Sequence, residues 1–193
     1  MSAEPAIAWD RVDDARAAFR ACLDALSRPG TRVRGLPMPG LAADPGRDAG
    51  AGILLALLDR GVALACDGDA ETARIAATVR GLTGACETGV EDADFVLAGP
   101  GGDPALAARA RRGSALAPDR GATLVYAGSG GRGCEARLSG PGVEGTPAAA
   151  LPLGAEEVES LRLANASPPL GVDVLAVAPD GSLVGIPRSV IGT

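Results

Sequence analysis

Residues 62–82 read VALACDGDAETARIAATVRGL, a short apolar run followed by an amphipathic segment. The opening VALAC is wholly apolar, which is typical of a strand buried inside a sheet. Asp69 then supplies a carboxylate that can accept hydrogen bonds from the free amides at the start of a helix. Ile75, Val79 and Leu82 recur at three- and four-residue intervals and would share the inner face of that helix. The stretch therefore predicts a buried strand followed by a capped helix.

The alternation of strands and helices continues on both sides of this unit. Residues 53–59 are apolar all round, which predicts a short helix packed deep in the fold. Short strands are predicted at Phe95–Ala98 and at residues 122–126 and 135–139. Residues 103–113 begin with Asp-Pro, which predicts a helix there. A carboxylate can cap its first amides, and proline is tolerated at the first helical position.

The last part of the chain predicts a helix and a hairpin. Two glutamates open residues 156–164, where they would face the positive end of a helix dipole. The apolar runs 172–178 and 183–186 flank the turn sequence Pro-Asp-Gly-Ser. We therefore expect an α/β fold, with a mixed β-sheet flanked by helices on both faces and a closing C-terminal β-hairpin. The length suits a single domain over residues 1–193.

The N-terminal part predicts one helix, a short strand and a loop. Residues 10–27 predict a helix that ends before a Pro-Gly pair. One apolar stripe follows three- and four-residue steps and predicts the buried face of this helix: Val12, Ala15, Phe19, Leu23 and Leu26. Residues 31–36 predict a strand. Residues 37–52 are rich in proline and glycine, so we expect a flexible loop there.

Two missing residue types restrict the chemistry. The chain has no histidine, and all eighteen basic residues are arginine. A Ser-His-Asp or Cys-His pair cannot be assembled from it, and a P-loop would lack its lysine. Pyridoxal phosphate would find no side-chain amine for its Schiff base. Carboxylates, thiols and one tyrosine remain for acid–base chemistry, and arginine remains for holding phosphate. We therefore name no catalytic residue, cofactor or metal.

Net charge and cysteine spacing indicate the binding partners and the cellular compartment to expect. The net charge of −6 disfavours general binding to nucleic acid or anionic lipid. No apolar run approaches the roughly 20 residues of a membrane span, and the N-terminus lacks the pattern of a secretory signal. The four cysteines lie at least twenty residues apart, so we expect reduced, mostly buried thiols in a cytoplasmic protein.

Four segments carry candidate sites, each with a simpler structural interpretation. Residues 99–102 (GPGG) could bind phosphate through free amides, although a tight strand-to-helix turn is the simpler interpretation. Residues 128–133 (GSGGRG) could form an anion nest with Arg132, although we favour a hairpin loop. Two acidic clusters could hold magnesium, although turns and helix caps also explain them: Asp67, Asp69 and Glu71, and Glu91, Asp92 and Asp94.

Five stretches resemble the PhnH family, in the same order and across most of the chain. The most distinctive is GSALAPDRGATLVY (residues 113–126), where Pro, an acidic residue and Gly-Ala-Thr-Leu precede a strand. The other four are FRACLDALSRPGTRV (19–33), LLALLDRGVALAC (54–66), LSGPGV (138–143) and PPLGVDVLAVAPDGSLVGIPRSV (168–190). One departure is Leu82-Thr83, where the family often has His-Thr, so this chain lacks any role that the histidine has.

The resemblance implies a fold like that of pyridoxal-phosphate-dependent transferases, without the cofactor. It also implies a non-catalytic or accessory subunit of the carbon–phosphorus lyase core complex, with PhnG, PhnI and PhnJ. That complex uses ATP to form ribose 1-alkylphosphonate 5-triphosphate in organic phosphonate catabolism. The iron–sulfur chemistry belongs to PhnJ, and the isolated chain is expected to be a homodimer.

Two arginines are the candidate phosphate-binding or interface residues. Arg120 and Arg188 each follow a turn sequence, and a guanidinium suits a phosphate. A surface or salt-bridged arginine is the simpler interpretation of both. The alternative function is a stand-alone α/β phosphate- or nucleotide-binding enzyme that uses Asp or Glu and a divalent metal. The acidic clusters are its only support.

Overall fold

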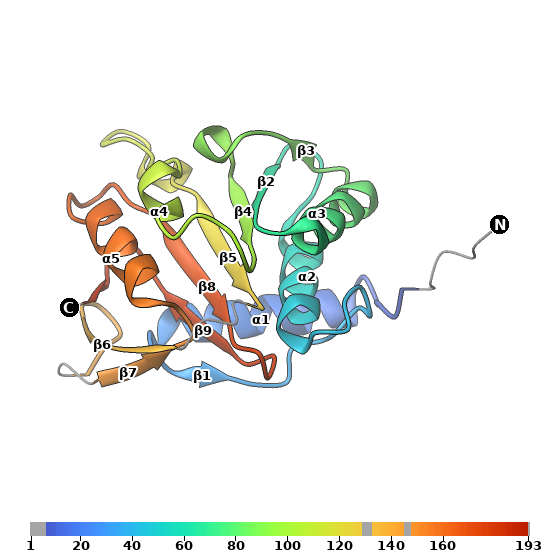
Figure 1. Cartoon of the computed structure of the whole chain (residues 1–193), viewed down its shortest axis with the longest axis horizontal. Helices are drawn as coiled ribbons and strands as arrows, with labels where there is room; N and C mark the ends of the chain where they lie inside the picture. The colour runs from blue at the N-terminus through green and yellow to red at the C-terminus, as the bar shows by residue number, and fades with distance from the viewer. Residues whose placement is uncertain (1–6, 129–132, 145–147, 193) are drawn as a thin grey trace.

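The computed structural model describes residues 7–128, 133–144 and 148–192. Its helices, including two 3-10 helices (η), are α1 (Asp13–Ser27), α2 (Pro45–Leu57), α3 (Ala70–Thr83), η1 (Val90–Asp92), α4 (Leu106–Arg109), η2 (Pro118–Arg120) and α5 (Ala155–Ala164). Its strands are β1 (Arg32–Val33), β2 (Ala63–Asp67), β3 (Cys86–Glu87), β4 (Phe95–Ala98), β5 (Thr123–Ala127), β6 (Cys134–Ser139), β7 (Ala148–Leu151), β8 (Asp173–Val177), β9 (Leu183–Ile186) and β10 (Ile191–Gly192). Figure 1 shows their arrangement.

A seven-stranded mixed sheet organises the fold, in the order β1-β9-β8-β5-β4-β2-β3. Five neighbouring strands of this sheet run parallel: β3, β2, β4, β5 and β8. Strand β9 is antiparallel to β8, and β1 is antiparallel to β9. A second, antiparallel sheet has the order β10-β6-β7. The mixed sheet and the β8–β9 hairpin confirm the predicted fold class.

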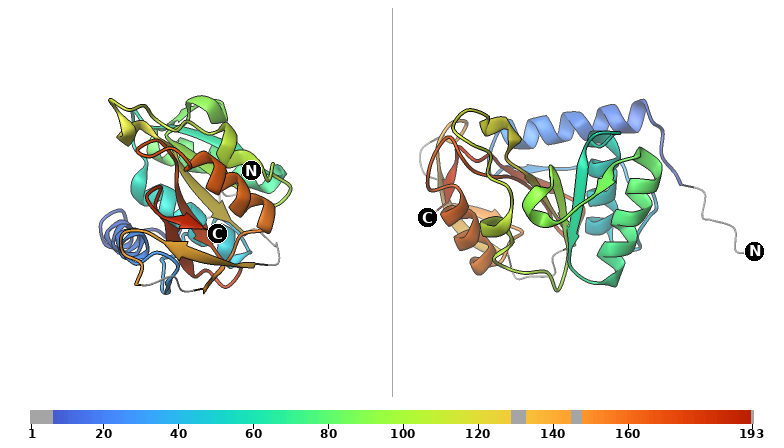
Figure 2. Two further views of the ribbon diagram at one scale, coloured as in Figure 1. Left: turned by 90° about the vertical axis from the view of Figure 1, so that its left-hand side faces the viewer. Right: turned by 90° about the horizontal axis from the view of Figure 1, so that it is seen from above.

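Helices cover both faces of the main sheet because its central strands are apolar on both sides. Along β5, Leu124 and Tyr126 pack in the core with α4, α5 and the small sheet. The alternate residues Val125 and Ala127 pack in the core with α1, α2 and α3. Figures 1 and 2 show α1 and α5 on opposite sides of the sheet.

The predicted inner face of α1 is wrong for Val12, Phe19 and Leu23. Its buried residues are Ala18, Cys22 and Ala25, whereas Phe19 and Leu23 are 47% and 53% exposed. The cause lies in β9, where a side chain at Gly185 would meet the backbone of Ala25 at 2.5 Å. Because the helix lies so close to the sheet, small side chains make the closest contact, and Phe19 and Leu23 face outward. Leu26, also predicted on the inner face, is half-buried and packs against the core.

The predicted flexible loop at residues 37–52 is also wrong in its second half, because α2 begins at Pro45. The Asp44 carboxylate accepts a hydrogen bond from Arg47 N at 2.9 Å, and proline occupies the first turn. The first half of the segment is held by Asp48, which is buried and accepts hydrogen bonds from the amides of residues 40–42.

Several helix and strand boundaries differ from the prediction because backbone groups form other hydrogen bonds than those predicted. The helix predicted over residues 103–113 is only α4, because the next residues pair as extended chain: Ala122 N donates to Arg111 O at 2.7 Å. The Asp103 carboxylate does accept a hydrogen bond from Ala105 N at 2.8 Å. The strand predicted over residues 31–36 shortens to β1, and β7 has no counterpart among the predicted strands.

Candidate functional site

Arg188 anchors the amino ends of β5 and β8. Its guanidinium binds the carboxylate of Asp173, the first residue of β8, with Nε lying 3.1 and 3.2 Å from the two oxygens. The same guanidinium donates to the carbonyl oxygens of Pro118 and Gly121 (3.2 Å for Gly121). A side chain at Gly121 would lie 2.4 Å from Arg188 Nη1, so the tight contact requires glycine there.

A surface hollow of about 610 Å³ opens beside this arginine. It is bordered by η2 before β5, by the segment that leads into β8 and by the residues after β9: Pro118, Asp119, Pro168, Pro169, Leu170, Asp173, Arg188 and Ser189. Asn165 fixes the approach to β8, because its side chain exchanges two hydrogen bonds with the backbone of Val172 at 2.8 and 3.1 Å. These hydrogen bonds and those of Arg188 tie two sides of the hollow to the sheet.

The two predicted arginines differ in their availability. Arg188 lines the hollow, but all three guanidinium nitrogens are already bonded within the protein. Arg120 is exposed, and within residues 7–128, 133–144 and 148–192 its side chain makes no hydrogen bond or ion pair. Its carbonyl oxygen accepts a hydrogen bond from Arg111 Nε at 2.6 Å, which holds the loop in place. Arg188 shapes the loop, and Arg120 presents a free guanidinium.

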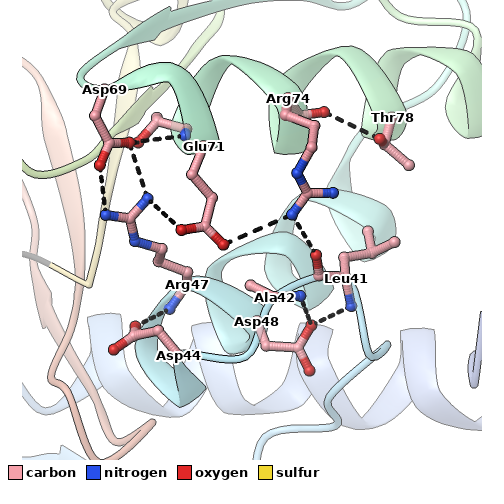
Figure 3. Close-up of polar contacts among 10 residues, drawn as sticks. Leu41, Ala42, Asp44, Arg47, Asp48, Asp69, Glu71, Arg74 and Thr78 are labelled. Carbon is pink, nitrogen blue, oxygen red and sulfur yellow. Dashed lines mark hydrogen bonds and ion pairs between the residues drawn. The ribbon is translucent and has the colours of Figure 1, made fainter.

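A second arginine network lies at the carboxyl ends of the strands, shown in Figure 3. Arg47 of α2 donates two hydrogen bonds to Asp69, at 2.7 and 2.8 Å, and lies 3.2 Å from Glu71. As predicted, Asp69 also caps α3, through the amide of Thr72 at 3.0 Å. The hydrogen bonds from Arg47 and then Thr72 hold the pKa of Asp69 well below its usual range.

Five of the six carboxylates in the acidic clusters accept hydrogen bonds or form ion pairs within the protein. The third member of the first cluster, Asp67, accepts a hydrogen bond from Asp103 N at 2.8 Å. In the second cluster, Glu91 pairs with Arg109 at 3.1 Å, and Asp94 pairs with Arg111. Among the described residues, no group of three or more His, Cys, Asp or Glu side chains could hold a metal ion.

The structure describes the first of the two glycine-rich segments in full and the second only in part. In residues 99–102, Gly99 N donates to Asp67 O at 2.8 Å and Gly102 N donates to Gly99 O at 3.2 Å, so the segment forms the tight turn. The anion nest predicted at residues 128–133, with Arg132, falls largely outside the described residues. The hairpin interpretation of that segment is wrong, because β5 and β6 belong to different sheets.

The position that departs from the resemblance is structural here. Leu82 lines a hollow between α1, α2 and α3, and its carbonyl oxygen accepts a hydrogen bond from Arg11 at 3.3 Å. The Thr83 hydroxyl donates to Val79 O at 2.9 Å and accepts from Ala85 N at 3.2 Å, which ends α3.

The remaining titratable groups are poorly suited to acid–base work. Burial raises the pKa of the Tyr126 hydroxyl, which has no hydrogen-bond partner in the described structure. Burial also raises the pKa of the Cys22 thiol to about 12. The cysteines are free, but the expectation of mostly buried thiols is wrong, because Cys66 and Cys134 are half-buried and Cys86 is exposed.

Sequence reasoning missed the role of Arg47. The Asp44-Pro45 pair could have indicated a helix start and placed Arg47 in its first turn. No local signal could have indicated Asp69 as the partner, because the two residues are brought together only by the packing of α2 beside α3.

The sequence was compared with known proteins. Residues 6–191 match the model of the family described as "Bacterial phosphonate metabolism protein (PhnH)". No curated protein matches. In the described part of the chain, no helix is both long and apolar enough to cross a membrane.

Proposed function

The chain belongs to the PhnH family of bacterial phosphonate metabolism proteins, and from this we propose that it is a non-catalytic, accessory subunit of the carbon–phosphorus lyase core complex. Its partners there are PhnG, PhnI and PhnJ, and the complex forms ribose 1-alkylphosphonate 5-triphosphate with ATP in the cytoplasm. The family match over almost the whole chain is the observation that carries this proposal.

The side chains of this protein support the accessory role. The chain has no imidazole and no side-chain amine, so its proton-transfer groups are carboxylates, thiols and one phenol. The carboxylates Asp69, Asp94 and Asp173 are ion-paired with arginines and so are already engaged within the protein. Chemistry supplied by other subunits fits this arrangement better than catalysis by the isolated chain.

Copurification tests the proposal directly. The tagged full-length chain, coexpressed with PhnG, PhnI and PhnJ, is expected to purify with them in a fixed ratio and to be required for triphosphate product formation. An unrelated α/β protein of similar acidity and carrying the same tag is the control. A chain that folds but never captures these subunits would overturn the proposal.

We further propose that Arg120 contacts an anion, a phosphate group or a partner carboxylate, while Arg188 positions the loop that carries it. Arg120→Ala is expected to lower product formation by the reconstituted complex about tenfold, as for the loss of one charge-assisted hydrogen bond of roughly 1.5 kcal/mol. Arg112→Ala, at another exposed position nearby, is the matched control. Unchanged turnover of Arg120→Ala would dismiss the role.

Two simpler measurements address the remaining proposals. Light scattering of the isolated chain is expected to give a homodimer, and a monomer at high concentration would contradict this. Titration with magnesium and ATP distinguishes the alternative of a metal-dependent enzyme. We expect no heat of binding from the isolated chain.

A further inference from the structure

The outer face of α1 carries an apolar surface that the fold does not use. Val12, Phe19 and Leu23 are 70%, 47% and 53% exposed. They are spaced by seven and four residues, so they follow one line along the helix, which we name the outer stripe. The buried residues of α1 are Ala18, Cys22 and Ala25, which lie on a different face of the helix. The outer stripe therefore has no role in the core.

A hollow extends this surface toward the ends of α2 and α3. Its volume is about 390 Å³, and Ala15, which lies between Val12 and Phe19 in the sequence, forms part of its wall. The other walls are mostly apolar: Ile7, Trp9, Leu55, Leu58 and Leu82. Such a hollow beside an exposed stripe can accept one large apolar side chain from a partner, as interface anchors do.

Arginines border the outer stripe on its solvent side. Arg16 and Arg20 lie three residues before Phe19 and Leu23, so each is a neighbour of a stripe residue. Arg16 forms an exposed pair with Asp13, at 2.8 Å. Arg20 is exposed and has no ion pair in the described part of the chain. Asp13 offsets the charge of Arg16, and Asp24, four residues beyond Arg20, pairs with Arg28. Arg20 is therefore the group on this edge that favours a partner carboxylate opposite it, although the whole chain is acidic.

The length and the charge together indicate the occupant. From Val12 to Leu23 the stripe extends about 16 Å, or about three turns of a facing helix. A second copy of α1 is a poor match, because in a twofold antiparallel pair the arginine edges of the two helices would face each other. An amphipathic helix with apolar residues at three- and four-residue spacing and acidic residues beside them matches both features.

We propose that the outer stripe and its hollow bind an acidic amphipathic helix of another subunit of the phosphonate-metabolism complex. This inference rests on the proposed function and adds the surface that makes the contact. The apolar residues supply the affinity, and Arg20 sets the charge preference and the orientation of the bound helix.

The test compares stripe variants in binding to the complex of PhnG, PhnI and PhnJ. The double variant Phe19→Asp/Leu23→Asp is expected to raise the dissociation constant about 30-fold or more, as for loss of an interface hot spot. Arg20→Glu is expected to raise it about fivefold, with a weaker salt dependence of the association rate. The matched controls are Leu116→Asp and Leu163→Asp, which replace exposed leucines outside α1 and should bind as the wild type does.

The outcomes separate the two proposals. If the wild type does not bind, the proposed function fails and the docking surface falls with it. If the wild type and the double variant bind equally, only the docking surface is overturned. If the double variant converts a wild-type dimer to a monomer in light scattering, the stripe joins two copies, and the acidic helix is ruled out. Circular dichroism and unfolding midpoints verify folding, and Arg20→Glu provides the test if the double variant does not fold.

Discussion

Arg188 and Arg47 lie at opposite ends of the parallel strands of one sheet, Arg188 at the amino ends of β5 and β8 and Arg47 beyond the carboxyl end of β2, and they use different partners. Arg188 binds one carboxylate and two backbone carbonyl oxygens, from Pro118 and Gly121. Arg47 binds two side-chain carboxylates, Asp69 and Glu71, which are 42% and 41% exposed. Carbonyl oxygens do not titrate, whereas exposed carboxylates can be protonated and are screened by salt. Two of the contacts of Arg188 therefore do not depend on ionisation, whereas both partners of Arg47 are exposed carboxylates whose contact solution conditions can weaken.

The largest effect is expected for Arg188→Ala. The change leaves the half-buried Asp173 without its cation and two carbonyl oxygens without a donor. Breaking a buried pair by removing one partner costs about 3 kcal/mol, so the free energy of unfolding should fall by roughly that amount. Urea denaturation measures it. Arg120→Ala, an exposed arginine on the loop that Arg188 anchors, should change it by less than about 0.5 kcal/mol. Equal effects of the two changes would contradict the contrast between them.

A smaller effect is expected for Arg47→Met, which keeps much of the side-chain length and removes the charge. Because both partners are about two-fifths exposed, the loss should be near 1 kcal/mol, and it should shrink in high salt. Unfolding midpoints at low and high salt measure it. Arg16→Met, in a more exposed pair with Asp13, is the control and should be close to neutral. A loss that is the same at every salt concentration would show that packing, and not charge, is at stake.

The fold was largely predictable where local signals and burial agree. The strand and capped helix at residues 62–82 and the hairpin that closes the chain appear as expected, because caps, turns and apolar runs act over a few residues. The inner face of α1 was not predictable. It depends on Gly185, which is far away in the sequence and forces small side chains into the contact. Periodicity alone selected the larger residues, which face outward.

The site was predictable only in part, for a similar reason. The turn sequences predicted Arg120 and Arg188 as site residues. The structure places both at the amino end of β5, where Arg120 lies on the preceding loop and Arg188 bonds to that loop. The sequence could not distinguish the free arginine from the bonded one. The partners of Arg188 are 15 to 70 residues away, and only the sheet brings them together.

The last and smallest effect concerns the pH dependence of the Arg47 network. The hydrogen bonds from Arg47 and from the amide of Thr72 depress the folded-state pKa of Asp69 below its unfolded value of about 3.9. A depressed pKa stabilises the fold above the unfolded value, and this stabilisation is lost as the pH falls toward the folded value. The variant Asp69→Asn keeps a capping side chain but loses the charge.

The free energy of unfolding of this variant should lie below that of the wild type by a constant amount above about pH 5. The difference should shrink steadily between about pH 4 and pH 2. Unfolding midpoints of both proteins across that range measure the difference. A deficit that does not change with pH would contradict the depressed pKa and mean that the charge of Asp69 does not stabilise the fold.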